Sequence, residues 1–298
     1  MTANASFTEK LIEVSITLGK GNFGAQAGNT KVINGLRVEC SIKQGGHPSK
    51  PGAQLKIYGM MENDMRSIAR NPFAPLANRK DYIKVRAGDF NGLTTVFTGE
   101  ISEAWANYHA PPNLYLHIAA LAGYYPSLIP VAPSSKKGSV SVASLMKDYA
   151  SQMGYTFEDN GVTAKIMNPY FHGSPYDQAS QLADAVNIEF GIDNDVLFIC
   201  PLGKPRGTKV PLISQETGMK ESPVFDKKGL KVETLFNPMV VLGGLIEIKS
   251  QVPNATGTWR VHSVDHHLES ENPSGQWITH IKAAHLLSTK STDVGGEM

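Results

Sequence analysis

Apolar and polar residues alternate over much of residues 11–120, which is the period of a half-buried β-strand. This alternation predicts strands over residues 11–18, 36–42, 53–58, 82–87, 94–101 and 114–120. Asn34-Gly35 and Asn91-Gly92 are turn signals, and the first predicts a hairpin between residues 31–33 and 36–42. Residues 62–70 change to helical spacing, and Asn71-Pro72 ends the predicted helix. We therefore expect an antiparallel sheet or barrel with one short helix.

The pattern changes after residues 123–133, an apolar stretch that contains prolines. Helical spacing over residues 139–154, with Ser141 as cap and Gly154 as terminator, predicts one helix. Ser174-Pro175 predicts the start of another, because Ser caps helices and Pro suits their first turn. Short strands are predicted over residues 155–157 and 163–167, and a hairpin over residues 188–199. This middle segment reads as a small α/β module.

The chain returns to strand patterns after residues 204–211, a polar linker. Strands are predicted over residues 213–214, 230–235, 240–248, 257–268 and 276–284, the last two as a pair. We therefore expect a mainly β protein with four parts. These are a β domain over residues 1–122, an α/β insertion over 123–203, a second β domain over 204–287 and a flexible tail over 288–298.

Composition narrows the function classes. The 298 residues carry a formal net charge of +1, so nothing draws the chain as a whole toward nucleic acid or an anionic membrane. Only 18% of residues are charged, against a typical value of about 25%, which favours surfaces buried against other subunits. No signal peptide or membrane-spanning apolar run is visible, so we expect synthesis in a cytoplasm. Cys40 and Cys200 are predicted to be buried thiols.

Histidines and acids near the C-terminus are the strongest candidates for a metal site or for catalysis. They are His262, Asp265, His266, His267, Glu269, His280 and His285. The even spacing of His262 and His266 permits one strand face, with His280 across from them, as a three-ligand set. The alternative is exposed or hydrogen-bonded histidines at a subunit interface. We favour this alternative, because neither a cysteine partner nor a helical HExxH motif accompanies them.

Other candidate chemistry is weaker. The acid pairs Glu216/Glu221 and Asp193/Asp195 fit either lysozyme-like carboxylates or solvated turn formers, and the turn-rich context favours the second. Residues 19–28 are glycine-rich but lack the GK[ST] motif and helix of a phosphate loop. No GxSxG motif occurs. We therefore predict no catalytic, cofactor or metal residues, and packing or interface roles for Tyr108, Tyr115, Tyr124 and Tyr125.

Short motifs follow one another in a fixed order in the last third of the chain. They are Thr217-Gly218-Met219, Ser222-Pro223, Gly229-Leu230-Lys231-Val232, Leu235-Phe236-Asn237-Pro238, Gly243-Gly244, Gly257-Thr258-Trp259 and Gly275-Gln276-Trp277. This ordered set resembles the baseplate hub proteins of long-tailed bacteriophages. The chain departs from that family pattern at Met219, where the family has Leu, and at His267-Leu268, where it often has Gly-Asp.

The resemblance implies a structural, non-enzymatic role in the virion. A homotrimeric ring at the tip of the tail tube would contain two tube-like β-barrel domains from each chain. Such a ring would join the sixfold tube to the threefold central spike, contact other baseplate proteins and let genome DNA pass without specific binding. Two alternatives stay open, a tail-associated cell-wall hydrolase on a β scaffold and a carbohydrate-binding module.

Overall fold

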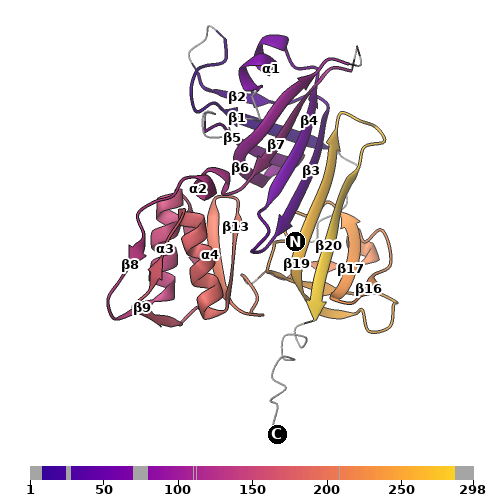
Figure 1. The fold of residues 1–298 in the computed structure, drawn as a ribbon. Helices are drawn as coiled ribbons and strands as arrows, with labels where there is room; N and C mark the ends of the chain where they lie inside the picture. The colour runs from indigo at the N-terminus through magenta and orange to yellow at the C-terminus, as the bar shows by residue number, and fades with distance from the viewer. Residues whose placement is uncertain are drawn as a thin grey trace.

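The computed structural model describes residues 9–24, 28–69, 80–109, 111, 113–207 and 209–285. The described part of the first β segment contains seven strands and one helix, in keeping with the predicted alternation and helical spacing (Figure 1). They are β1 (Leu11–Thr17), β2 (Thr30–Ile33), β3 (Val38–Gly45), β4 (Gly52–Tyr58), α1 (Glu62–Ile68), β5 (Tyr82–Asp89), β6 (Gly92–Asn107) and β7 (Tyr115–Leu121). The predicted helix stop at Asn71-Pro72 lies outside the described residues.

The C-terminal β segment consists of short strands and two long ones. They are β15 (Leu212–Ile213), β16 (Val224–Asp226), β17 (Gly229–Leu235), β18 (Leu245–Ile248), β19 (Gly257–Ser270) and β20 (Trp277–His285), with a single 3₁₀ turn at Gln215–Thr217. The long strands β19 and β20 pair antiparallel, as predicted. The expected tail over residues 288–298 lies outside the described part of the chain.

The two β segments form one continuous sheet. Its order is β16-β17-β20-β19-β3-β4-β7-β6-β5-β1-β2, with β18 and β15 attached beside β19. The protein is therefore mainly β, as predicted, but the described residues contain no closed barrel. The segments meet where residues 263–270 of β19 pair antiparallel with β3, which places the long β19–β20 pair beside the first segment in Figure 1.

Two long strands change partner along their length. The first part of β6 pairs with β5, and from Glu100 onward β6 pairs with β7, with a bulge between Ile101 and Glu103. Strand β19 pairs first with β18 and then with β3, with a bulge between Val261 and Ser263. Bulges bend a strand and increase its twist, so they allow one strand to serve two neighbours that point in different directions.

The predicted hairpin across Asn34-Gly35 is wrong. Gly35 does turn the chain with φ 64°, but β2 pairs with β1, and β3 pairs with β4 and β19. Both edges of β3 are occupied, so it has no edge left for β2. The second predicted turn is confirmed, because Asp89 faces Gly92 at the tip of the β5–β6 hairpin.

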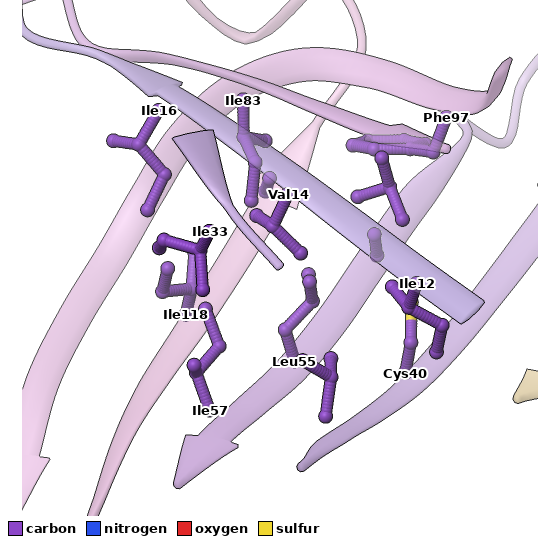
Figure 2. Packing of buried hydrophobic residues seen from close by; sticks show 14 of the residues in the cluster. Ile12, Val14, Ile16, Ile33, Cys40, Leu55, Ile57, Ile83, Phe97 and Ile118 are labelled. Atoms are coloured by element: carbon purple, nitrogen blue, oxygen red, sulfur yellow. The ribbon is translucent and has the colours of Figure 1, made fainter. Parts of the chain in front are cut away.

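The first hydrophobic core lies where the sheet folds back on itself. Ile12, Val14 and Ile16 of β1 lie over Leu55 and Ile57 of β4 in Figure 2, and all five are buried. The alternating residues between them point outward, so strand periodicity alone selects the inward face. Leu268 of β19 joins this core, which ties the C-terminal segment to the first one by packing as well as by backbone pairing.

The middle segment is a compact α/β module with its own core. Its elements are α2 (Tyr124–Leu128), β8 (Ser134–Ser135), β9 (Ser139–Ser141), α3 (Val142–Met153), β10 (Thr156–Asp159), β11 (Lys165–Met167), β12 (Tyr170–Phe171), α4 (Pro175–Val186), β13 (Ile188–Asp193) and β14 (Val196–Pro201). Ser174 and Asp177 form a capping box at the start of α4, as its sequence signature predicts. Ser141 occupies the N-cap of α3 without a side-chain cap bond. Residues 123–133, the predicted boundary of this module, contain α2.

No helix among the described residues is long and apolar enough to cross a membrane.

Candidate functional site

The C-terminal histidines lie on opposite faces of the β19–β20 pair. His266 points into the core, where its Nδ1 lies 2.9 Å from the Thr279 hydroxyl and its ring meets Phe236 edge-on. Burial lowers the pKa of His266 to about 4, with a smaller contribution from neighbouring His267, so the ring is neutral at physiological pH. His266 is therefore a core residue with a satisfied hydrogen bond.

His267 and His280 lie on the other face, with ring centroids 5.2 Å apart. Partial burial, and then the charge of His280, lower the pKa of His267. His262 is the extra residue of the β19 bulge, so the even spacing from His266 does not bring the two onto one face. His285 instead packs edge-on against Trp259. Among the described residues, no three His, Cys, Asp or Glu side chains are grouped closely enough to hold a metal ion.

The two acid pairs suggested by the sequence lie in different surroundings. Glu216 and Glu221 are both exposed, on the 3₁₀ turn and on the loop after it. Asp193 and Asp195 flank the β13–β14 turn, but Asp193 pairs with Arg206 while Asp195 accepts a hydrogen bond from the Tyr82 hydroxyl. These two acids therefore hold parts of the chain together, which is neither of the roles considered from the sequence.

Arg206 makes the most buried ion-pair cluster of the described residues. Its guanidinium donates two hydrogen bonds to Glu158, 3.0 and 2.9 Å long, and one of 2.6 Å to Asp193. It also stacks over Phe198 at 4.3 Å. The hydrogen bonds from Arg206 hold the pKa of Glu158 below its ordinary value. We call Arg206, Glu158 and Asp193 the arginine joint, because they fix the connection between the α/β module and the C-terminal segment.

A second connection supports the arginine joint. Arg260 of β19 forms an ion pair with Glu189 of β13, and its Nε donates to the Lys204 carbonyl oxygen at 2.9 Å. A pocket of about 380 Å³ lies beside this pair, where the loop after β3, the module and β19 come together. His47, Phe190 and His262 are among its lining residues. The module thus contacts both β segments.

A tyrosine joint links the α/β module to the first β segment. Glu100 of β6 accepts hydrogen bonds from the Tyr155 hydroxyl and from the Tyr124 backbone N–H, each 3.0 Å long. The Tyr155 hydroxyl in turn accepts a 2.9 Å bond from the Gly123 backbone N–H. Burial raises the pKa of Glu100. Tyr82 and Asp195 complete the tyrosine joint, so two hydroxyl–carboxylate bonds cross between module and sheet.

Removing the Tyr155 hydroxyl is expected to loosen this connection. Tyr155→Phe leaves the Glu100 carboxylate and the Gly123 N–H each short of one partner, which costs about 1–3 kcal/mol of unfolding free energy. Chemical denaturation of the purified protein measures the loss. Tyr170→Phe is the matched control, because Tyr170 is exposed on the same module. Equal stability of the two variants would contradict a role for the Tyr155 hydroxyl.

The outer face of the sheet, opposite the cores, is polar and balanced in charge. Opposite charges pair along it: Lys56 with Glu39, Arg37 with Glu39, Lys231 with Asp226, and Lys220 with Glu233. A shallow pocket of about 230 Å³ crosses the β3–β19 junction and is lined by residues of both segments, among them Lys56, His117 and His267. These pairs neutralise part of the charge along the described strands, and Lys43 of β3 and Lys282 of β20 add positive charge to the same face.

The remaining sequence predictions have mixed outcomes. Cys40 and Cys200 are buried and unpaired, as predicted, and burial raises their pKa values to about 12 and about 11. Tyr125 is buried, whereas Tyr108 is exposed. Part of the glycine-rich stretch at residues 19–28 lies outside the described residues. The sequence patterns did not indicate the roles of Arg206, Glu100 and Tyr155. A basic residue within a polar linker, such as Arg206, gives little signal of burial.

Comparison with known proteins identifies the family. A family model described as "Baseplate hub gp41" matches residues 11–278. No curated protein matches the sequence. Two solved structures are similar in fold, the 43 kDa tail protein of prophage MuSo2 from Shewanella oneidensis and the tail protein from Neisseria meningitidis MC58. The first has a TM-score of 0.61 at 9% identity, and covers 92% of this chain and 98% of its own. The second has a TM-score of 0.62 at 10% identity, with 92% and 96% covered.

The family match spans nearly the whole described chain, and it agrees with the resemblance carried by the C-terminal motifs. Both structural neighbours are tail proteins, and each aligns over more than nine-tenths of its own length. The solved structures show that the fold is that of these tail proteins. The family match over residues 11–278 shows that the chain belongs to the baseplate hub gp41 family.

Proposed function

We propose that three copies of this chain form a ring that joins the sixfold tail tube to the threefold central spike. Membership of the baseplate hub family supports a structural role in the tail baseplate of the virion. The observation that carries the finer proposal is the pairing of β19 with β3, which joins two β segments of one chain side by side in one sheet. Two such segments per chain let a threefold ring offer six tube-like units to its neighbour.

The proposed division into lobes is residues 1–122 and 204–287, with residues 123–203 as an insertion. The three largest hydrophobic cores support it, since each consists mostly of residues from one part of the chain. The parts are also joined by packing: Leu268 enters the first core, Ala122 enters the core of the insertion, and Leu242 packs with Phe198 and Cys200 in a small fourth cluster. The insertion then sits outside the sheet, where other baseplate proteins can contact it.

We assign the outer sheet face to the wall of the channel through which DNA leaves. Ion pairs within the face neutralise part of its positive charge, although Lys43 of β3 and Lys282 of β20 also face outward. Phosphate binding depends on Lys and Arg that can replace counterions, and a wall with neutralised charges lets DNA pass. The partners in this proposal are the tube protein above, the spike protein below and the surrounding baseplate proteins.

Light scattering of the purified chain tests the proposal. We expect a mass of three times the 32.2 kDa of one chain, independent of concentration in the micromolar range. Averaged images of tail tips should place that threefold ring between tube and spike. A stable monomer that is absent from assembled tails would contradict the proposal.

A further inference from the structure

One end of the sheet is a short edge strand with two exposed apolar side chains. Strand β16 pairs with β17 on one side, and no described strand pairs with its other side. Val224 and Phe225 of β16 are 62% and 46% exposed. Natural proteins blunt free edges with charges, prolines or a covering loop, since an exposed apolar edge recruits further strands. Here β16 is three residues long, with Pro223 before it and Asp226 at its end, so charge and proline protect the ends of the edge. Val224 and Phe225 between them stay exposed, and this apolar pair indicates a surface that another chain covers.

A second edge without a described partner strand lies on the last part of β6, where the sheet continues to β5 only from the first part of that strand. After its bulge, β6 pairs only with β7 from Glu103 to Asn107, because its pairing with β5 ends at Glu100. Trp105, in the middle of that stretch, is 44% exposed and stacks on His117 of β7. Helix α1 shares the core with Ala104, so it lies on the inward face of β6. An exposed tryptophan beside an open edge is typical of an interface residue.

Strand direction makes the two free edges compatible. The strands from β16 to β6 run in the order β16-β17-β20-β19-β3-β4-β7-β6, and every neighbouring pair in that run is antiparallel. With an even number of alternating strands, β16 and β6 point in opposite directions. Rotation about a ring axis parallel to the sheet's strands keeps those directions. A neighbouring copy therefore brings its β16 antiparallel to this β6, and the alternation continues without a break.

We propose that β16 of one copy pairs antiparallel with the free edge of β6, residues 103–107, of the next copy. The inference rests on the proposed ring and names the contact that closes it. Head-to-tail contact between two different edges is the heterologous kind that generates rings. Val224, Phe225 and Trp105 supply the β-branched and aromatic side chains that stabilise cross-strand neighbours. Burial of these side chains at the junction accounts for their exposure in the single chain.

Cysteine cross-linking tests the contact. Val224→Cys is combined in turn with Glu103→Cys, Trp105→Cys and Asn107→Cys to cover the register. Within one chain these positions are roughly 30 Å apart along the sheet, which is too far for a disulfide. Oxidation is expected to give covalent dimers and trimers with at least one pair. The buried native thiols Cys40 and Cys200 stay out of reach.

Val224→Cys with Val32→Cys is the control pair, since Val32 is exposed on β2, at the topological end of the sheet. A trimer by light scattering that forms no cross-link through β6 overturns the inference and leaves the proposed ring standing. Efficient cross-linking through Val32 overturns it as well, and assigns the junction to β2. A chain that stays monomeric overturns both the inference and the proposed ring.

A charge at the edge gives an independent readout. Phe225→Asp is expected to reduce the mass from three chains to one, because the carboxylate would be desolvated at the junction. Met167→Asp, on the α/β module and 66% exposed in the folded chain, is expected to keep the trimer. Circular dichroism checks that both variants fold. A folded Phe225→Asp protein that is still fully trimeric contradicts the inference.

Discussion

Replacing Arg206 by alanine is expected to lower the free energy of unfolding by about 3–5 kcal/mol, because it leaves the nearly buried Asp193 carboxylate and the partly buried Glu158 carboxylate without their cation. Glu158 loses a two-pronged guanidinium contact, and Asp193, whose side chain is only 10% exposed, loses its ion pair. The stacking of the guanidinium on Phe198 is lost too. Coulomb attraction is strongest where water is excluded, so the Arg206–Asp193 ion pair contributes more to the free energy of unfolding than an exposed ion pair does.

Thermal and urea unfolding of the full chain measure the loss. Arg206→Lys retains the charge but cannot donate the forked pair of hydrogen bonds, so we expect an intermediate loss. Arg66→Ala is the matched control: its ion pair with Glu62 is exposed and should contribute less than about 1 kcal/mol. If Arg206→Ala and Arg66→Ala unfold alike, the arginine joint does not stabilise the fold.

The position of this joint explains why the sequence did not reveal it. Residues 204–211 are polar and rich in turn formers, which is the pattern of an exposed linker. Burial of Arg206 depends on Glu158, 48 residues earlier, and on the β13–β14 turn. The tyrosine joint has the same character, since Tyr82 and Asp195 are 113 residues apart. Contacts between distant residues leave no periodic trace in a single sequence.

Strand positions, by contrast, were predictable where alternation was strict. In β1 the inward face of Ile12, Val14 and Ile16 follows from a period of two. Strand partners were not predictable, because an edge is chosen by competition among all strands. The turn at Asn34-Gly35 formed without a hairpin, and the strands predicted on either side of Asn237-Pro238 pair with β20 and β19 instead of each other. Local turn chemistry fixes a bend in the chain, whereas the partner is fixed by the whole sheet.

The histidines of β19 and β20 show the same limit of sequence patterns. Their spacing permits a three-ligand metal site, which was the less favoured of two alternatives. The bulge at His262 changes the alternation by one residue, so His266 faces the core while His262 does not share its face. A bulge has no reliable signal in one sequence, although it decides which side chains can meet.

Acidification from pH 6.5 to 4 is expected to lower the free energy of unfolding by about 3 kcal/mol through His266 alone. Its imidazole titrates near 6.5 in the unfolded chain, and burial lowers the pKa to about 4 in the folded protein. Between these values the unfolded state binds a proton that the folded state excludes, so stability falls as pH falls. Above pH 6.5 both states are neutral, and below pH 4 both are protonated, so the effect is confined to that window.

Urea unfolding at several pH values measures the slope, and His266→Asn removes it. The asparagine amide can still reach the Thr279 hydroxyl, which limits the direct loss of stability. His172→Asn is the control, because His172 is exposed on the α/β module and its loss should leave the slope unchanged. Carboxylates contribute to acid unfolding in all three proteins, so the difference between His266→Asn and wild type isolates the buried ring. If the two proteins lose stability in parallel from pH 6.5 to 4, His266 is not the group that excludes the proton.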